Sequence, residues 1–411
     1  MPRTIETLPT PAEACSRILT LARPGEPIEV SLGEALGLVL AEPAVADVDL
    51  PPFDRALADG YAMKASEAVP GALLRVAGLR WSRPGVDDAL ESGEAIRVAQ
   101  GDPLPVGADA VILAEDVRRD PETGPTRVIE ILRGVEAGRD VARRGLLLEA
   151  GTTLAPEGTR LKGPMVGLLA SQGCVHPVCH RRVRAAVMAV GDHLVGPTEA
   201  PVMHRERNAA GASIVAQLLR AGAMPHDLQA VAEARFASTF ERATCAPLIV
   251  VLGPTSRPVL RALRSFGVEP VISGVAMKPG SRARYGVIRD DTGEVAHHVF
   301  HLPIAPVAAS IAFSILVEPL LARLQGAPPA GLRTVPAVWD GTHRGTSTHL
   351  RAVPVTVTVD AEARQIARPV SLRGLDDLPG FARADGLALL PAQSGPWKGG
   401  EVVEVARFDA A

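Results

Sequence analysis

Sixteen residues near the N-terminus, LPPFDRALADGYAMKA (50–65), gather side chains that could do chemistry. They include the carboxylates of Asp54 and Asp59, a DG pair, and two of the chain's few aromatic residues, Phe53 and Tyr61. A carboxylate in such a loop can serve as a catalytic residue. An aspartate before glycine is also common in turns, where it accepts hydrogen bonds from its own backbone. The residue types alone leave both roles open for Asp59.

The basic residues are strongly biased toward arginine. The chain has four lysines, at 64, 162, 278 and 398, against 39 arginines. Such a bias indicates a GC-rich genome, in which a lysine without a role tends to drift to arginine. A retained lysine is therefore of more interest than usual.

Three histidines, His297, His298 and His301, form an HHxxH motif that would suit a metal. On a strand, alternate side chains face opposite ways, so His297 and His301 share a face while His298 does not. We therefore predict no metal site here. The cysteines Cys174 and Cys179 are interpreted as ordinary buried thiols.

Apolar runs predict the elements that must position these side chains. PAEACSRILTLA (11–22) predicts a helix, and the S-x-x-E capping signature at 31–34 predicts a second helix that ends near 42–43. Short β-type runs from about 73 to 131 predict a small β-rich domain. EAGTTLAPEGTRL (149–161) predicts a strand pair, and GPMVGLLASQGC (163–174) predicts a helix that ends at Gly173.

From about 181 to 326, apolar strands alternate with helices. The strands are RAAVMAVGD, APLIVVLG and GEVAHHVFHLP, and the helices are ASIVAQLLRAG, RPVLRALRSFG and VAASIAFSILVEPLLARLQ. This alternation predicts a parallel sheet covered by helices on both faces. After the linker GAPPAG (326–331), four short runs predict a small all-β domain. The predicted fold class is α/β plus β, in several domains.

Bulk composition excludes some classes of protein. A length of 411 residues indicates two to four domains, and a net charge of −3 argues against a protein that binds nucleic acid through its phosphates. No secretory leader and no apolar run of about 18 residues is recognised, so we predict no membrane span. Four cysteines without a CxxC pair favour a reduced, cytoplasmic location.

Several motifs together resemble the molybdopterin molybdenumtransferase family, which includes the E domain of gephyrin. LPPFDRALADGYAMKA resembles the family's PPFDNSAMDGYA signature, and GDPLPVGADAVILAEDV (101–117) resembles its GADAVV stretch. RRGLLLEAGTTLAPEGTRLKGPMVGLLASQGC, VAMKPGS (275–281) and PGFARADGLALLPAQSGPWKGGEVVEV also resemble family segments, in the family's order. The resemblance covers nearly the whole chain.

The resemblance implies an elongated, dimeric subunit with a parallel-sheet α/β domain that binds molybdopterin, a β-rich inserted domain and a C-terminal small β-barrel. The expected divisions are a discontinuous linker domain (1–45 and 141–180), the β-rich domain (46–140), the α/β domain (181–326) and the C-terminal β domain (331–411). The implied activity is insertion of molybdate into adenylylated molybdopterin, with release of AMP and with Mg²⁺ present. The implied site lies between the α/β domain of one subunit and the β-rich domain of the other.

The resemblance also implies site residues. Asp59 and Lys278 are the expected catalytic residues, and the expected residues that bind the pterin substrate are Gly191, Asp192, Asn208, Gly253, Ser256, Pro303 and Pro306. No protein-bound metal site is assigned.

The chain departs from the family pattern mainly in the α/β domain. The glutamate of the family's GDEL motif is His193, and the SGGVS loop has become a segment with Pro254 and Pro258. Each proline removes a backbone N–H donor that could reach a phosphate. The PGNP motif reads Pro303-Ile304-Ala305-Pro306, so its glycine and asparagine are gone.

Two classes of function follow from these departures. The first is a molybdenumtransferase with impaired activity, acting as a homodimer in the cytoplasm. The second is a non-catalytic paralogue that acts as a heterodimer partner of an intact paralogue, or as a chaperone in molybdoenzyme maturation. Neither interpretation involves nucleic acid or a membrane.

Overall fold

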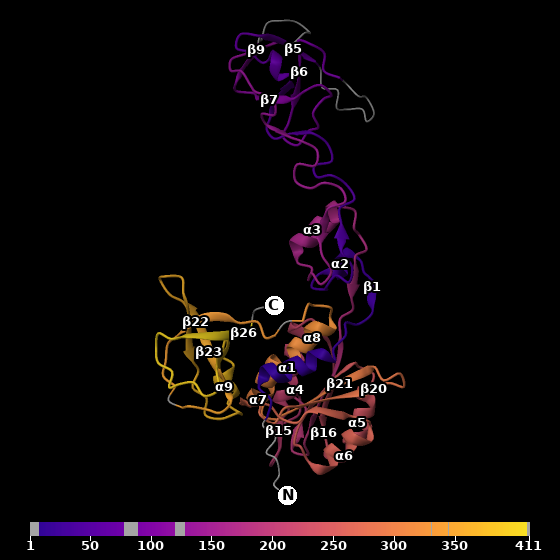
Figure 1. Cartoon of the computed structure of the whole chain (residues 1–411), viewed down its shortest axis with the longest axis vertical. Coiled ribbons are helices and arrows are strands. Elements are labelled where there is room, and N and C mark those ends of the chain that lie inside the picture. The colour runs from indigo at the N-terminus through magenta and orange to yellow at the C-terminus, as the bar shows by residue number, and fades with distance from the viewer. Residues whose placement is uncertain (1–7, 78–88, 120–127, 330, 344, 409–411) are drawn as a thin grey trace. The chain divides into compact units, whose positions relative to one another are not determined.

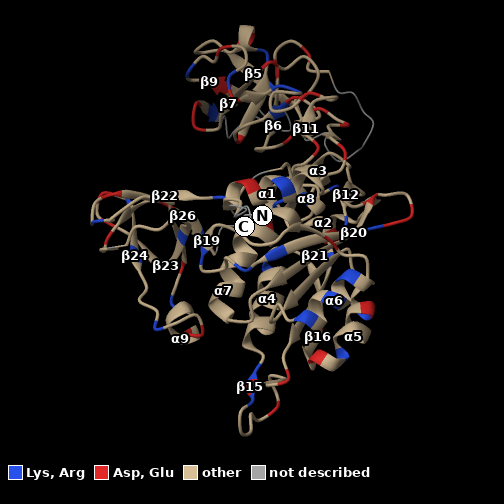
Figure 2. Ribbon diagram, turned by 60° about the horizontal axis from the view of Figure 1, so that its bottom comes forward, with Lys and Arg blue, Asp and Glu red and all other residues tan. Residues whose placement is uncertain are grey.

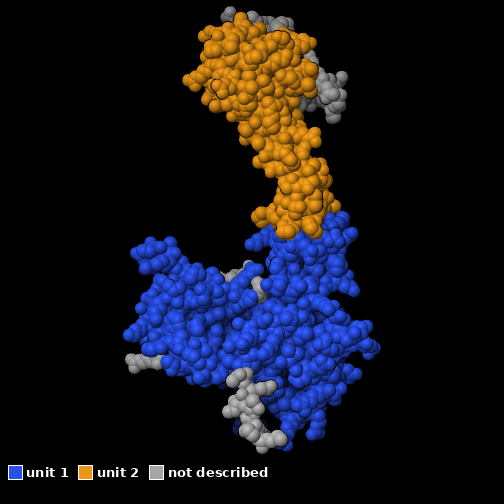
Figure 3. Space-filling model, viewed as in Figure 1, with its two compact units in different colours: residues 1–42, 157–163, 176–411 blue, residues 43–156, 164–175 orange. Residues whose placement is uncertain are grey.

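The computed structural model describes residues 8–77, 89–119, 128–329, 331–343 and 345–408. The chain divides into two compact units (Figure 3). Unit 1 comprises residues 1–42, 157–163 and 176–411, and unit 2 comprises residues 43–156 and 164–175. Parts of the predicted runs, at 78–79, 126–127 and 330, lie outside the described residues.

Unit 1 contains an α/β domain, a short linker segment and a C-terminal barrel (Figure 1). Its helical elements are α1 (Pro11–Thr20), α2 (Leu32–Ala35), α4 (Ala209–Arg220), η2 (Glu233–Arg235), α5 (Phe236–Ala243), α6 (Arg257–Ser265), α7 (Pro306–Ala312), the π-helical η3 (Phe313–Val317), α8 (Glu318–Leu324) and α9 (Leu378–Phe381). The strands of the α/β domain are β13 (Arg184–Val190), β16 (Met224–Val231), β17 (Leu248–Leu252), β18 (Glu269–Ile272), β20 (Arg284–Arg289) and β21 (Val295–Leu302). Smaller pairs are β1 (Pro27–Glu29) with β12 (Val178–His180), and β14 (Leu194–Val195) with β15 (Glu206–Arg207).

The central sheet has the order β16-β13-β17-β21-β20-β18. The first four strands are parallel, but β20 runs antiparallel to β21 and β18 runs antiparallel to β20. The sheet is therefore mixed, and the prediction of a parallel sheet is wrong for these two strands, because the short loop between β20 and β21 makes a hairpin rather than a helical crossover. From β13 the chain first adds β16 on one side and then β17 on the other, so the strand order reverses between β13 and β17.

Side chains of the central strands alternate between two cores. Ala185, Val187 and Ala189 of β13 pack with α1, α4 and the helix that runs through α7, η3 and α8. Ala186 and Met188, one residue out of phase, pack with α5 and α6 on the other face. Figure 2 shows charged residues on α5 and α6 and none on α7. The predicted covering of both faces by helices is confirmed.

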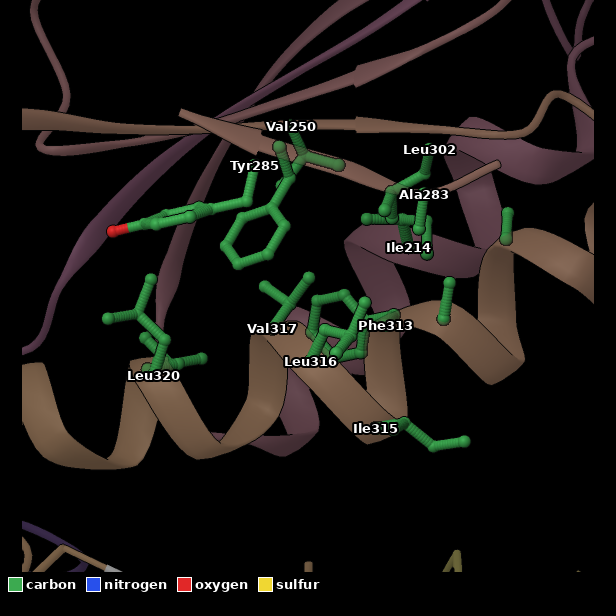
Figure 4. Packing of buried hydrophobic residues seen from close by; sticks show 14 of the residues in the cluster. Ile214, Val250, Ala283, Tyr285, Leu302, Phe313, Ile315, Leu316, Val317 and Leu320 are labelled. Atoms are coloured by element: carbon green, nitrogen blue, oxygen red, sulfur yellow. The ribbon is translucent and has the colours of Figure 1, made fainter. Parts of the chain in front are cut away.

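The helix from Pro306 to Leu324 is long and apolar enough to span a membrane by length and composition. The expectation that the chain has no apolar run of about 18 residues is therefore wrong. However, 83% of its most apolar window is buried inside the protein. In Figure 4, Phe313, Leu316 and Val317 point toward Val250 and Tyr285 of the sheet. These contacts identify it as a core helix.

The C-terminal domain is a closed barrel, as predicted. Its ring of five strands is β22 (Val335–Trp339), β23 (Leu350–Val359), β24 (Gln365–Pro369), β25 (Gly386–Leu390) and β26 (Val402–Arg407), closed by pairing of β23 with β25. A two-residue strand from the α/β domain, β19 (Met277–Lys278), pairs with β23. Trp339 is fully buried in the barrel core. Closure leaves few free strand edges in this domain.

Unit 2 is built on the six-stranded sheet β7-β4-β6-β5-β9-β8. Its elements are β2 (Ala44–Val45), β3 (Arg55–Ala56), β4 (Gly60–Met63), η1 (Ala65–Glu67), β5 (Leu73–Ala77), β6 (Glu94–Val98), β7 (Ala110–Leu113), β8 (Val117–Arg119), β9 (Val128–Ile131), β10 (Val141–Ala142), β11 (Thr153–Ala155) and α3 (Gly163–Ser171). The β-rich character predicted from the sequence is confirmed. The predicted strand pair within 149–161 is wrong, because β11 pairs with β2 instead.

The second predicted helix is much shorter than expected. The carboxylate of Glu34 accepts hydrogen bonds from the backbone N–H and the hydroxyl of Ser31, so the capping signature was read correctly. The helix nevertheless ends at Ala35, and Gly37 follows with a φ of 79° that favours glycine. Leu40 then bridges to Cys179 rather than continuing the helix.

Candidate functional site

Three loops meet at the carboxyl edge of the parallel strands. Gly191 and Asp192 follow β13, residues 253–256 follow β17, and residues 303–306 follow β21. Neighbouring parallel strands place such loops side by side, and ligands of open α/β sheets bind where the strand order reverses. The sheet therefore gathers most of the predicted α/β site residues at one edge.

The barrel reaches the same edge through β23, which pairs with β19 of the α/β domain. Lys278 of β19 stands in register with Arg351 of β23, and Met277 stands in register with Leu350. Two basic residues that are 73 positions apart in the sequence are thereby neighbours in one sheet. The pairing concentrates positive charge between the α/β domain and the barrel.

A cleft of about 990 Å³ lies at this edge. Its basic side chains are Lys278, Arg282 and Arg351, and His301 and His343 also line it. No carboxylate is among the described residues that line the cleft. The remaining lining residues are Gly253, Pro254, Thr255, Pro279, Gly280, Ser281, Leu302, Pro303, Ile304, Ala305, Ala308, Ala352, Val353, Pro354, Val370, Leu372 and Leu375. Positive charge without nearby negative charge favours an anionic ligand.

Three buried polar atoms of cleft residues have no hydrogen-bond partner among the described residues. They are Nδ1 of His301, Nε2 of His343 and Nε of Arg351. A buried polar group without a partner costs free energy, so native proteins rarely leave one except where a ligand or water completes the site. Three such atoms around one cleft indicate a ligand site.

Burial keeps the cleft histidines neutral. It lowers the pKa of His301 to about 4, and Nε2 of that ring lies 3.2 Å from the carbonyl oxygen of Gly253. Because the carbonyl can only accept, Nε2 carries the proton and Nδ1 is an acceptor. Burial, and then the charge of Arg351, also lower the pKa of His343. The cleft thus combines fixed cations with a neutral acceptor for an N–H or O–H group.

The loop after β17 offers few free backbone donors. The N–H of Gly253 already donates to the carbonyl of Leu302 over 3.1 Å, and Pro254 has no N–H. A Cβ atom at Gly253 would lie 3.0 Å from the carbonyl oxygen of Val190, so the close approach of the two loops requires glycine. Anion binding in this cleft therefore depends on side chains more than on backbone amides.

Several predicted binding residues have structural partners. Asn208 caps α4, where its Oδ1 accepts a hydrogen bond from the N–H of Gly211 over 2.9 Å. Ser256 caps α6 and donates to Oε1 of Glu233 over 3.0 Å. Asp192 Oδ1 accepts from the N–H of Glu233 over 3.0 Å. Of the predicted α/β-domain residues, Gly253, Lys278 and Pro303 line the cleft, while Gly191, Asp192, Asn208, Ser256 and Pro306 are not among its lining residues.

Asp59 lies in unit 2, on an exposed turn before β4. Its Oδ1 accepts a hydrogen bond from the N–H of Gln100 over 2.8 Å. Asp54 is held more firmly, by Nη1 of Arg143 at 2.6 Å and by the N–H of Arg144 at 2.7 Å. Burial alone would raise the pKa of Asp54, but these hydrogen bonds outweigh it and leave the pKa below its usual value.

The HHxxH motif is divided among three different partners. His297 Nδ1 lies 3.0 Å from the carbonyl oxygen of Ala246, and His298 Nδ1 lies 2.7 Å from the hydroxyl of Tyr285. His301 faces Gly253 instead. Within the part of the chain that the structure describes, no three His, Cys, Asp or Glu side chains gather as a metal-binding group.

Sequence reasoning missed Arg351, Arg282 and His343. Arg351 opens an apolar run that predicts a strand, and a basic residue at a strand end is a weak signal by itself. Its relation to Lys278 depends on the two-residue strand β19, which no sequence pattern predicts. His301 was noted only as part of a metal motif.

Comparisons with known proteins agree on one family. Residues 10–173 match the family model described as the MoeA N-terminal region (domain I and II). The chain is 31% identical over 336 residues to molybdopterin molybdenumtransferase 1 of Mycobacterium tuberculosis, covering 75% of this chain and 76% of the relative. It is 26% identical over 411 residues to the molybdopterin molybdenumtransferase of Bacillus subtilis, covering 96% and 92% of the two chains.

A solved structure shows the same fold. The crystal structure of the molybdopterin biosynthesis MoeA protein from Pyrococcus horikoshii superposes with a TM-score of 0.81 at 25% sequence identity, covering 98% of this chain and 99% of that chain. The order of motifs, the sheet topology, the closed barrel and these likenesses lead to one conclusion: the chain belongs to the molybdopterin molybdenumtransferase (MoeA) family.

Proposed function

We propose that this chain acts in molybdenum cofactor biosynthesis, by binding molybdopterin or its adenylylated form together with molybdate in the cleft. The observation that carries the proposal is the cleft itself, in which Lys278 and Arg351 stand in register and the described lining residues include no carboxylate. Three buried polar atoms of the cleft, one of them Nε of Arg351, also have no partner among the described residues. Phosphate groups and molybdate are oxyanions, and a guanidinium binds oxyanions through paired N–H donors. The pterin ring offers N–H donors that suit a neutral acceptor such as Nδ1 of His301.

We further propose that the chain inserts molybdate slowly compared with relatives that keep the glycine-rich loops. Pro254 and Pro258 remove backbone donors, and Gly253 has already used its own. Mg²⁺ does not fit the cleft by itself, because hard cations favour sites with carboxylate ligands and the described lining residues include three basic side chains and no carboxylate. We therefore derive no step through Mg²⁺. In this proposal Lys278, Arg282 and Arg351 hold and orient the oxyanions.

The direct test uses purified full-length chain with adenylylated molybdopterin and molybdate, and measures AMP release. The Bacillus subtilis relative serves as the active reference. We expect binding of the pterin substrate by calorimetry and AMP release well below the reference rate. Absence of binding would contradict the assignment, and a rate equal to that of the reference would contradict the reduced activity.

We propose as well that the chain has the four domains and the elongated subunit of the family. In the same proposal it forms a homodimer and is located in the cytoplasm. We assign exposed apolar side chains of unit 2 to the interface of this homodimer. They include Leu146, Leu147 and Val175, which are 61%, 65% and 50% exposed. Light scattering of the wild type and of Leu147→Glu tests this part, with a dimer expected only for the wild type.

A second candidate function is that of a heterodimer partner, which donates Asp59 to the α/β domain of an intact paralogue. It is favoured by the contrast between the exposed, retained Asp59 and the altered loops of the α/β domain. Co-expression with an intact paralogue should then give a complex whose AMP release falls for Asp59→Asn. A chain that purifies only with itself would contradict this role.

A further inference from the structure

A second pocket of unit 1 shares no lining residue with the cleft. It has a volume of about 320 Å³, near the lower limit for small-ligand sites. It lies among the linker segment, the end of α4, the η3 and α8 turns, and the chain that enters and leaves the barrel. We call it the arginine pocket, since Arg160, Arg182, Arg220, Arg333 and Arg407 line it.

Three of these arginines have no carboxylate partner among the described residues: Arg160, Arg182 and Arg333. Arg160 Nη1 donates to the carbonyl of Gly37 over 2.7 Å, and Arg182 Nη2 donates to the carbonyl of Leu36 over 3.0 Å. Carbonyl groups orient a guanidinium but do not neutralise its charge. Burial, and then the charges of Arg333 and Arg182, lower the pKa of Arg160. The three like charges therefore destabilise one another while the pocket holds no anion.

Gly222 lies close to two of these guanidinium groups. A Cβ atom at this position would lie 3.5 Å from Nη1 of Arg182 and 4.0 Å from Nη1 of Arg160. Gly222 also has a φ of 80°, which favours glycine. Arg182 Nη1 also donates to the carbonyl of Gly222 over 3.4 Å, so the turn after α4 contacts this guanidinium directly.

Ser314 provides an independent indication of a ligand. It lines the arginine pocket and is 3% exposed, yet its Oγ has no hydrogen-bond partner among the described residues. A helical serine ordinarily bonds to a carbonyl one turn earlier, but Ser314 lies in the π-helical turn Phe313–Val317, where the ordinary bonding pattern is interrupted. A buried hydroxyl beside unpaired cations can donate to the oxygen of a bound anion.

The remaining charges define one wall of the pocket. Arg220 Nη2 contacts Oε2 of Glu318 over 2.8 Å, and Arg220 Nη1 donates to the carbonyl of Phe408. Glu318 is the one carboxylate among the described lining residues, and it is already paired. Leu219, Pro319, Ala322, Leu332 and Phe408 supply apolar surface on the same lining. The lining of the pocket therefore includes apolar as well as cationic side chains.

We propose that the arginine pocket binds a small phosphate monoester, with its phosphate dianion among Arg160, Arg182 and Arg333 and its organic group on the apolar surface. A dianion neutralises three neighbouring guanidinium groups better than a monocarboxylate, and guanidinium groups match the geometry of phosphate oxygens. The hydroxyl of Ser314 donates to one of these oxygens. This site is independent of the transferase assignment.

The test must first silence the cleft, which also attracts anions. We would use the full chain with Lys278→Gln and Arg351→Gln as the background, and titrate it with phenyl phosphate, inorganic phosphate and benzoate by calorimetry. We expect phenyl phosphate to bind at one site, at least tenfold more tightly than either of the other two. Equal binding of inorganic phosphate would overturn the organic part of the proposal, and equal binding of benzoate would overturn the preference for a dianion.

Variants in this background identify the site. Arg333→Gln and Ser314→Ala should each weaken phenyl phosphate binding by tenfold or more, whereas Arg242→Gln, an exposed arginine on α5, should leave it unchanged. Ser314→Ala should also leave the melting temperature without ligand unchanged or higher, since it removes an unpartnered buried hydroxyl. An unchanged affinity in both pocket variants, or an equal loss in Arg242→Gln, would overturn the proposal.

Discussion

The Asp54–Asp59 loop of unit 2 and the cleft of unit 1 use their charged groups in opposite ways. In the loop, Asp54 accepts hydrogen bonds from the side chain of Arg143 and the backbone N–H of Arg144. Asp59 accepts one from the backbone N–H of Gln100. In the cleft, no carboxylate is among the described residues that line it with Lys278, Arg282 and Arg351, and three buried polar atoms lack partners in the same part of the chain. The carboxylates of the loop therefore stabilise the loop itself, while the cleft has polar groups that a ligand can satisfy.

The largest expected effect is a difference in acid stability between the two units. Burial lowers the pKa values of His298 and His301 to about 4, from 6.5. Between those values the unfolded chain binds protons that the folded chain does not, so unit 1 loses stability as the pH falls from 6.5 to 4. Each histidine contributes up to about 3 kcal/mol. The pKa of Asp54 is lowered, so protonation of Asp54 destabilises unit 2 only at a pH below the range in which the histidines act.

Hydrogen exchange by mass spectrometry at a series of pH values checks this order. Amides of β17 and β21 should lose protection before those of β4 and β6. The difference should shrink in His298→Gln and His301→Gln. Simultaneous loss of protection in both units would contradict the assignment of the acid sensitivity to the two histidines.

The second effect concerns the ligand groups of the cleft. Arg351→Gln should weaken molybdate binding by about tenfold to a hundredfold, since a charge-assisted hydrogen bond contributes about 1.5–3 kcal/mol. Calorimetry measures the affinity, and the melting temperature should change little. Arg364→Gln is the matched control, because Arg364 lies in the same barrel but pairs with Asp360 at the surface. A similar loss of molybdate affinity in both variants would contradict the assignment of molybdate binding to the cleft.

The third effect concerns the hydrogen bonds that hold the Asp54–Asp59 loop of unit 2. Asp54→Asn should destabilise unit 2 by about 1–2 kcal/mol, since it removes the charge that Arg143 and the N–H of Arg144 hold. Asp59→Asn is the control, because an amide oxygen can still accept the single bond from Gln100. Urea unfolding measures both. A larger loss in Asp59→Asn would reverse the comparison.

The smallest effect separates a cap from a ligand residue. Ser256→Ala should cost about 1 kcal/mol of stability, because Ser256 caps α6. Ser265→Ala near the other end of α6 should cost less. If Ser256→Ala instead weakens binding of the pterin substrate without loss of stability, Ser256 belongs to the ligand site after all.

The sequence predicted those helices and strands whose apolar residues mainly serve burial in the core. β13, β17, β21, α4 and α6 were recognised, because their apolar periodicity reflects burial in a two-faced sheet. β16 was missed because it lies at the sheet edge, with Pro225 and several exposed polar residues. Within the site, Lys278 was named but its partner Arg351 was not, since their pairing is a property of the tertiary fold.

The two-residue strand β19 has a practical consequence. The N–H of Leu350 donates to the carbonyl of Ala276 over 3.0 Å, next to the pair formed by Lys278 and Arg351. An oxyanion bound between these two side chains would place negative charge close to this hydrogen bond. The NMR chemical shift of the Leu350 amide should therefore change when a ligand fills the cleft. This signal would report binding without any label on the ligand.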